Sequence, residues 1–132
     1  RSIYVEVRRN FLSPMMLAFD APVPATTVGR RTVSNVPAQA LIMMNDPFVV
    51  QQAKRWTESL MKVEGAEARL AKIYATAFGR SMTAKEKEEA LSFLKQQGAE
   101  YGLTEGAWQN EMRVWADYCH VIFNVKEFVF VN

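Results

Sequence analysis

Four polar residues near the C-terminus have the types and the spacing of a proton-transfer site. Arg113, Asp117, His120 and Asn124 recur at intervals of 4, 3 and 4 residues, which places them on one face of a helix. His120 is the chain's single histidine, and a carboxylate such as that of Asp117 can orient an imidazole for general acid–base chemistry. The alternative is structural, with His120 and Asn124 holding the helix end and Arg113 pairing with Asp117 one turn away. We favour the structural interpretation.

Two aspartates beside prolines, Asp20 and Asp46, could form a catalytic pair. Glycosidases use two carboxylates that stand roughly 5–10 Å apart on either side of a sugar. Each aspartate also has a local explanation, because Asp46 can cap a helix that begins at Pro47 and Asp20 can accept backbone N–H groups in a turn. We therefore predict no catalytic residue in this chain.

Two adjacent arginines, Arg30 and Arg31, could bind an anionic group. A guanidinium offers a planar pair of donors that matches a sulfate or a carboxylate. The alternative is that one of the two pairs with Asp20 or Glu127 and holds its loop in place. The full set of candidate binding residues is Asp20, Arg30, Arg31, Asp117, His120, Asn124 and Glu127.

Cys119 and His120 match only the end of the motif that attaches c-type haem. That motif is C-x-x-C-H, and position 116 is an alanine. Cys119 also lies on an apolar stripe with Trp115 and Ile122, so we expect it to be a small buried hydrophobic residue. One histidine and one carboxylate on a face are too few ligands for a metal. We expect no metal and no cofactor in this chain.

The composition is that of a globular domain. The chain has 132 residues, of which 49% are hydrophobic and 23% charged, and its formal net charge is +2. These values exclude a disordered or collagen-like chain, and the charge is too small to indicate a nucleic-acid partner. Uninterrupted apolar runs, such as residues 40–44, are too short to span a membrane.

The expected secondary structure that positions these residues changes near residue 45, from loops to helices. All five prolines lie at or before position 47, so residues 1–45 are expected to be rich in loops, with a short helix near 37–44. The remainder, 46–132, has apolar residues at helical spacing. We predict a mainly α, four-helix bundle-like single domain over residues 1–132, with helices near 46–63, 66–78, 83–97 and 104–124.

Local signals mark where these helices begin and end. Gly79 and Gly98 are expected to end the second and the third helix, because glycine readily adopts the left-handed conformation of a C-cap. Thr83 and Glu86 have the spacing of a capping box that opens the third helix. The apolar run 15–19 is expected to be a loop that contacts another domain, since an exposed apolar patch usually marks an interface.

The two ends of the chain have strand-like character. Residues 2–8 alternate between apolar and polar side chains, and residues 128–131 are aromatic and β-branched. Because a lone strand leaves its backbone groups unpaired, we predict that the two segments form a two-stranded ladder. The ladder would bring Arg8 or Arg9 within reach of Glu127.

Three motifs give the chain a family resemblance: AFDAP at 18–22, PAQALIMMNDPFV at 37–49 and N-x-x-E-F at 124–128. They resemble the C-terminal domain of unknown function of large planctomycete-type exported proteins, often linked to a c-type cytochrome module. The resemblance implies a fragment of a longer protein in the periplasm or cell envelope of bacteria that degrade complex polysaccharides, with any signal peptide outside this chain. The one departure is an extra alanine, Ala38, between Pro37 and Gln39.

Three functions are consistent with these observations. The first is a non-catalytic accessory or interaction domain that packs on a preceding domain of the same polypeptide. The second is binding or processing of a sulfated polysaccharide by Asp20 and the two arginines. The third is a redox role beside an attached cytochrome, with Trp115, Tyr118 and His120 near the haem.

Overall fold

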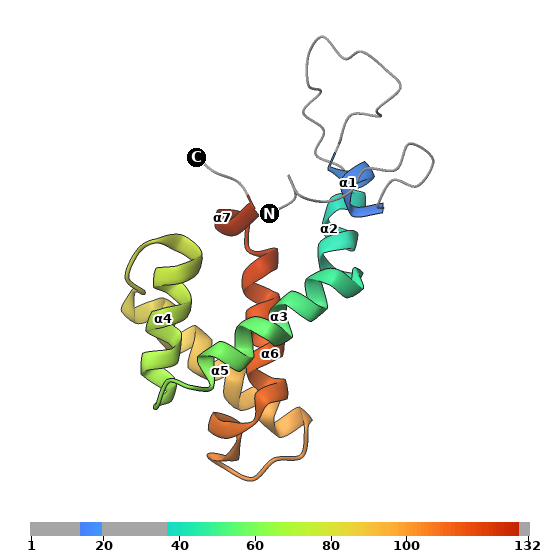
Figure 1. The fold of residues 1–132 in the computed structure, drawn as a ribbon. Coiled ribbons are helices and arrows are strands. Elements are labelled where there is room, and N and C mark those ends of the chain that lie inside the picture. The colour runs from blue at the N-terminus through green and yellow to red at the C-terminus, as the bar shows by residue number, and fades with distance from the viewer. Residues whose placement is uncertain (1–13, 20–36, 130–132) are drawn as a thin grey trace, which may run out of the picture. The chain divides into compact units, whose positions relative to one another are not determined.

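The computed structural model describes residues 14–19 and 37–129, which are mainly helical (Figure 1). The described residues contain no strand, which confirms the predicted mainly α fold. In chain order the elements are α1 (Pro14–Ala18), α2 (Pro37–Asn45), α3 (Pro47–Leu60), α4 (Ala66–Phe78), α5 (Ala84–Glu100), the 3-10 helix η2 (Ala107–Asn110), α6 (Met112–Asn124) and α7 (Lys126–Val129).

The chain divides into two compact units, Arg1–Asp46 and Pro47–Asn132. This boundary lies next to the last proline of the sequence, Pro47, and to the point where apolar residues begin to recur at helical spacing. That all 132 residues form a single domain stays a prediction.

In the N-terminal unit, helices α1 and α2 contact one another. Helix α2 confirms the short helix predicted near 37–44, and it begins at Pro37, whose fixed φ suits the first helical position. The loop expected at 15–19 is wrong, because residues 15–18 belong to α1. Pro14 starts this helix, and the methionines, leucine and alanine that follow are good helix formers. The strand predicted over 2–8 lies outside the described residues.

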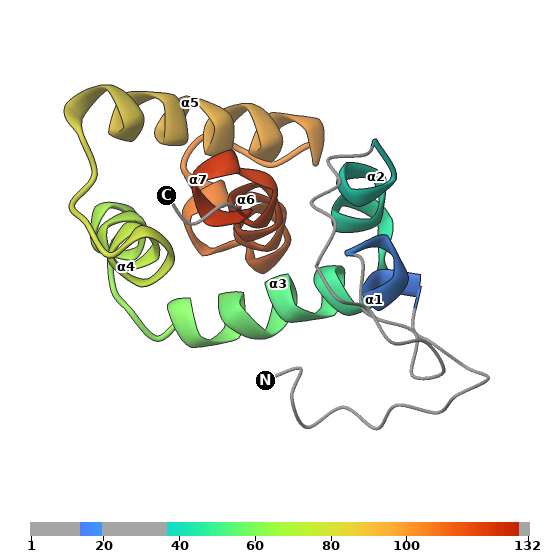
Figure 2. The same ribbon diagram turned by 90° about the horizontal axis from the view of Figure 1, so that it is seen from above.

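Helix α6 is the centre of the C-terminal unit. Figure 2 shows it inside a frame made by α3, α4 and α5, and it packs on both α3 and α5. In this view α4 and α6 are seen nearly end-on, whereas α3 and α5 lie across it. Helices α3 and α5 therefore cross α4 and α6. The bundle-like arrangement that we expected, in which helices run side by side, is not confirmed.

The core of this unit gathers around α6. Val114, Trp115 and Cys119 on α6 are completely buried. The neighbouring helices bury the apolar residues that their spacing predicts, among them Ala53, Leu60, Leu70, Ile73, Ala90 and Leu94. Trp56 is partly buried and packs against this core.

A charged residue, Arg69, is also buried within this unit, with 5% of its surface exposed. Its Nε donates a hydrogen bond of 2.7 Å to the carbonyl of Val63, and its Nη1 donates one to the carbonyl of Gln109. The guanidinium lies 5.4 Å from the ring centroid of Trp115. Trp115 donates from Nε1 to the same carbonyl of Gln109 over 2.8 Å. Arg69 therefore ties the segment before α4 to the segment before α6.

Two of the predicted helix boundaries are confirmed. Gly79 ends α4 in the left-handed conformation, with φ 68°, which glycine adopts without a steric penalty. Thr83 and Glu86 form the complete capping box at the start of α5. Each supplies a partner for a backbone N–H of the other, so the first turn of α5 leaves fewer donors unpaired.

The boundary predicted at Gly98 is wrong, because α5 continues through it to Glu100. Gly98 is buried, and a Cβ built at this position would lie 2.6 Å from the Cβ of Trp108. Glycine is therefore present here to admit the tryptophan of η2, and not to cap a helix.

The helix predicted over 104–124 is interrupted. Residues 107–110 form η2, and α6 begins at Met112, where the side chain of Glu111 accepts a hydrogen bond from the N–H of Arg113. Trp108 is buried but Met112 is exposed, although a continuous helix would place both, four residues apart, on one face. A 3-10 helix has three residues per turn, so a spacing of four across the break no longer keeps residues on one face.

The strand predicted at 128–131 is also wrong for its first two residues. Phe128 and Val129 belong to α7, which follows α6 after a single extended residue, Val125. Packing overrides their β propensity, because the Phe128 ring lies 5.1 Å from that of Phe123. The partner segment 2–8 lies outside the described residues, and the predicted two-stranded ladder is not confirmed.

Replacing Gly98 by alanine is expected to destabilise the protein. The added methyl group would collide with Trp108 at a cost of about 1–3 kcal/mol, which exceeds the gain of about 1 kcal/mol in helix propensity. Urea unfolding followed by circular dichroism measures the difference. The control is Ser92→Ala, an exposed position on the same helix, which should change the free energy of unfolding by less than about 0.5 kcal/mol. A Gly98→Ala protein as stable as the wild type would contradict the packing role.

Candidate functional site

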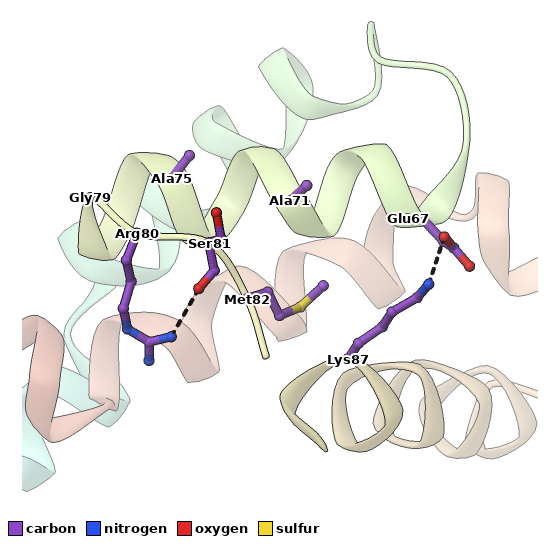
Figure 3. Close-up of a pocket in the computed structure, with 8 residues that line it drawn as sticks. All are labelled: Glu67, Ala71, Ala75, Gly79, Arg80, Ser81, Met82 and Lys87. Carbon is purple, nitrogen blue, oxygen red and sulfur yellow. Dashed lines mark hydrogen bonds and ion pairs between the residues drawn. The ribbon is translucent and has the colours of Figure 1, made fainter. Parts of the chain in front are cut away.

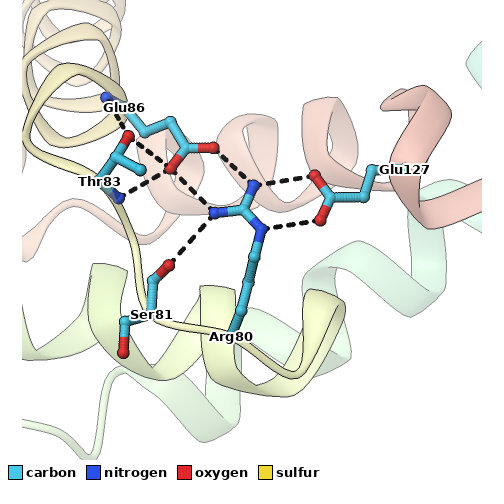
Figure 4. Close-up of polar contacts among 5 residues, drawn as sticks. All are labelled: Arg80, Ser81, Thr83, Glu86 and Glu127. Atoms are coloured by element: carbon cyan, nitrogen blue, oxygen red, sulfur yellow. Dashed lines mark hydrogen bonds and ion pairs between the residues drawn. The ribbon is translucent and has the colours of Figure 1, made fainter.

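Among the described residues of the C-terminal unit, the side chain with the most hydrogen bonds is that of Arg80, directly after the glycine that ends α4. Figure 4 shows its guanidinium between two carboxylates, that of Glu86 on α5 and that of Glu127 on α7. On the α7 side, Nε donates to Oε1 of Glu127 over 2.8 Å and Nη2 donates to Oε2 over 2.9 Å. This is the two-pronged geometry for which arginine is suited.

On the α5 side, Arg80 makes a second two-pronged contact. Nη2 donates to Oε1 of Glu86 over 2.6 Å and Nη1 donates to Oε2 over 3.0 Å. The remaining hydrogen bond, of 3.2 Å, runs from Nη1 to the carbonyl of Ser81. A guanidinium has five N–H donors, and these five hydrogen bonds use all of them. Arg80 therefore has no donor left for a ligand unless a carboxylate moves away.

The same contacts fix the charge of both carboxylates. Hydrogen bonds from Arg80, and then from the backbone and hydroxyl of Thr83, lower the pKa of Glu86 to about 2. Hydrogen bonding to Arg80 also lowers the pKa of Glu127. A general acid needs a pKa near the working pH, so neither group can serve as a proton donor near neutral pH.

The guanidinium of Arg80 also lies against two aromatic rings. Arg80 is 5.6 Å from the ring centroid of Tyr74 and 5.5 Å from that of Phe78, within the range of cation–π contacts. Tyr74 in turn shares a hydrogen bond with Tyr118 of α6. Burial, and then this hydrogen bond, raises the pKa of Tyr118 above its ordinary value. Its hydroxyl is therefore neutral and occupied.

A hollow of about 680 Å³ lies next to this cluster, along the exposed side of α4 (Figure 3). The α4 residues that line it include the small side chains of Ala71 and Ala75. One end is spanned by an ion pair of 2.7 Å between Lys87 and Glu67, and Arg80 closes the other end. The charged side chains that line the hollow, Glu67, Arg80 and Lys87, already have partners, so it offers no unpaired charge to a substrate.

Asp117, a candidate from the helical polar face, joins α6 to α5. It accepts hydrogen bonds from Nε2 of Gln97 over 2.9 Å and from the hydroxyl of Tyr101 over 2.7 Å. Arg113 instead pairs with Glu111 over 2.9 Å and lies 4.9 Å from the Tyr101 ring centroid. Asp117 and Arg113 therefore hold the ends of α5 and α6 together, but the predicted pairing of Arg113 with Asp117 is wrong.

The other candidate residues fall in different places. His120 is half-buried on α6, and its carbonyl accepts a hydrogen bond of 2.8 Å from the side chain of Asn124. Glu127 belongs to the Arg80 cluster. Asp20, Arg30 and Arg31 lie outside the described residues, as do Arg8 and Arg9, which we expected near Glu127.

Cys119 is buried in the core, as predicted. Burial raises the pKa of its thiol to about 11, so the reactive thiolate is scarce near neutral pH. Within residues 14–19 and 37–129 there is no group of three or more His, Cys, Asp or Glu side chains that could hold a metal ion. No helix in that part of the chain is long and apolar enough to cross a membrane.

The sequence interpretation missed Arg80 and the second role of Glu86. The capping box indicated that Glu86 bonds the backbone of Thr83, and nothing further was expected of it. Arg80 follows the glycine that ends α4, so it lies outside the helix. Its partner besides Glu86 is Glu127, which lies 47 residues further along the chain. Such a contact depends on the tertiary fold and has no local signal.

Comparison with known proteins places the chain in a family. Residues 1–94 match the model of PSD1, described as a protein of unknown function (DUF1553). The match covers more than half of the 132 residues, so the chain belongs to this family, and its resemblance to a domain of unknown function is confirmed. No curated protein and no solved structure matches the chain.

The ionised state of Glu86 predicts a specific loss of stability in acid. Because the pKa of Glu86 is lower in the folded state, about 2, than its ordinary value of 4.5, its contribution is complete above pH 4.5. That contribution is lost as the pH falls towards 2. In Glu86→Gln, which keeps the capping geometry, the free energy of unfolding should fall less steeply over this range than in the wild type. Urea titrations at half-unit pH steps measure the slope.

Glu88→Gln is the matched control for this titration. It removes one exposed carboxylate from the same helix and leaves the Arg80 cluster in place, so it should keep the acid-dependent loss that Glu86→Gln lacks. Equal slopes for the wild type and Glu86→Gln would show that the Arg80 contact does not stabilise the fold.

Proposed function

We propose that this member of the DUF1553 family is a non-catalytic interaction domain that packs against other parts of a larger exported bacterial protein. The observation that supports this proposal is the exposure of large apolar side chains on α1 and α2. Leu41 and Met44 of α2 are 59% and 57% exposed, and Leu17 and Phe19 at α1 are also exposed. Such residues are normally covered in a stable protein, either by its own core or by a partner.

The sequence of α2 explains why the described part of its unit leaves these residues uncovered. The helix reads PAQALIMMN, and four large apolar residues follow one another from Leu41 to Met44. Consecutive residues point to different sides of a helix, so one neighbouring helix can cover only part of this set. A helix that is apolar on all sides belongs inside a larger assembly.

Export and the link to a cytochrome module are part of this proposal through the family resemblance of the sequence motifs. A direct redox role has less support. Of the three residues proposed to lie near a haem, Trp115 and Tyr118 are buried in the core, and only His120 is partly exposed. The polysaccharide alternative depends on Asp20, Arg30 and Arg31, which lie outside the described residues.

Hydrogen exchange tests the proposal directly. The backbone amides of 37–45 are expected to exchange at least tenfold more slowly in a longer natural polypeptide that contains this sequence than in the 132-residue chain, because the partner surface covers α2. The double variant Leu41→Ser/Met44→Ser should remove most of that added protection.

The matched control is Lys54→Ser/Glu58→Ser, two exposed positions one turn apart on α3. Both double variants should leave the free energy of unfolding of the 132-residue chain within about 0.5 kcal/mol per substitution, and only the α2 variant should lose protection. Equal exchange of α2 in the short and the long polypeptide would refute the proposal.

A further inference from the structure

A second surface of the C-terminal unit has the features of a docking groove. It lies between α3 and α4, is bounded by the ends of α6 and α7, and has a volume of about 360 Å³. We call it the α3–α4 groove. Its apolar surface comes from Trp56, Ala77, Phe123 and Phe128, and its polar residues include Gln52 and Arg55. It involves neither α1 nor α2, so it is independent of the surface proposed above.

The apolar side of the groove is a row of three aromatic rings. Trp56 of α3 stacks on Phe123 of α6 with 5.4 Å between ring centroids. Phe123 in turn contacts Phe128 of α7 over 5.1 Å. Phe128 is exposed and Trp56 is half-buried. An added apolar side chain would therefore meet ring faces and edges instead of water, which is favourable.

The polar side of the groove holds an arginine with no partner in the described part of the chain. The other arginines described are each bound to carbonyls or carboxylates: Arg69, Arg80 and Arg113. Arg55 makes no hydrogen bond, ion pair or ring contact with any described residue, and the same is true of Gln52 one turn earlier. Arg55 therefore keeps all its donors available beside an aromatic surface.

Helix α7 completes the groove, and the Arg80 cluster holds α7. Glu127 is fixed by two hydrogen bonds to Arg80 (Figure 4), and the next residue, Phe128, forms one wall. This gives the ionic cluster a role beyond stability: Glu127 is a positioning residue for Phe128.

We propose that the α3–α4 groove binds a segment of a partner protein that presents a large apolar side chain next to a carboxylate. Its volume lies at the lower end of the range for ligand pockets, ~300–1,000 Å³, which suits one or two side chains. The aromatic row accepts the apolar side chain, and Arg55 pairs with the carboxylate through charge-assisted hydrogen bonds. Tryptophan and arginine side by side are also the residues most enriched at the energetic centres of protein interfaces.

Selection from a random peptide library displayed on phage tests this inference with the full 132-residue chain. Selected peptides are expected to share an aromatic or large aliphatic residue within two positions of Asp or Glu. Synthetic copies labelled with fluorescein then give dissociation constants by fluorescence polarisation. Replacing the acidic residue of the peptide by its amide should weaken binding about tenfold or more, as expected for a lost charge-assisted contact.

Variants of the chain locate the binding site. Arg55→Gln and Phe128→Ala should each weaken binding about tenfold or more, whereas the neighbouring exposed position Lys54→Gln should leave it unchanged. Glu127→Gln should weaken it less than Phe128→Ala, and circular dichroism should show that all four variants fold. Because Phe128 is exposed, its replacement leaves the core intact.

Two results would overturn the inference: selected peptides that share no acidic residue, or peptides whose binding is insensitive to both Arg55→Gln and Phe128→Ala. The variant Leu41→Ser/Met44→Ser should leave peptide binding unchanged, so failure here and failure of the proposed function are separate outcomes.

Discussion

The C-terminal unit depends on one buried cation. Arg69 is taken almost completely out of water, so its guanidinium requires strong partners, and the carbonyls of Val63 and Gln109 supply them. An unpaired buried charge would cost several kcal/mol. The Gln109 carbonyl also accepts from the indole of Trp115, so one oxygen positions both the arginine and the central tryptophan. The segments before α4 and before α6 are thereby fixed relative to the core.

A second arginine, Arg80, also holds several elements together, in this case at the surface. Arg80 joins the end of α4, the start of α5 and the short α7. Its five donors are all used, which explains why a cluster with the residues of an acid–base site has a structural role. By contrast, Arg55 has no partner within the described residues. A guanidinium whose donors are all used, such as that of Arg80, therefore stabilises the fold, whereas the guanidinium of Arg55 is available to a partner.

Local signals predicted the helices well and their interruptions poorly. Helical spacing and caps identified α3, α4 and α5, because those elements bury one stripe each and their ends are satisfied by nearby residues. In the sequence, Gly98 resembles a C-cap. Its role, which is to leave room for Trp108, depends on the packing of another element and has no local signal. Likewise Phe128 has high β propensity, but its contact with Phe123 decides its conformation.

Of the candidate site residues, Glu127 does lie in a polar cluster, yet its partner Arg80 is too distant in sequence to be inferred.

The extent of the family match bears on what the folding unit is. The match ends at Leu94, inside α5, while the residues that complete the core lie beyond it, on α6. Leu70 and Ile73 are fully buried in a core to which α6 contributes five side chains: Val114, Trp115, Tyr118, Cys119 and Ile122. The Arg69 contact reaches past the match as well, since Gln109 is its acceptor. Residues 1–94 alone would leave apolar faces of α3, α4 and α5 open to water, so the unit that folds must include residues 95–129.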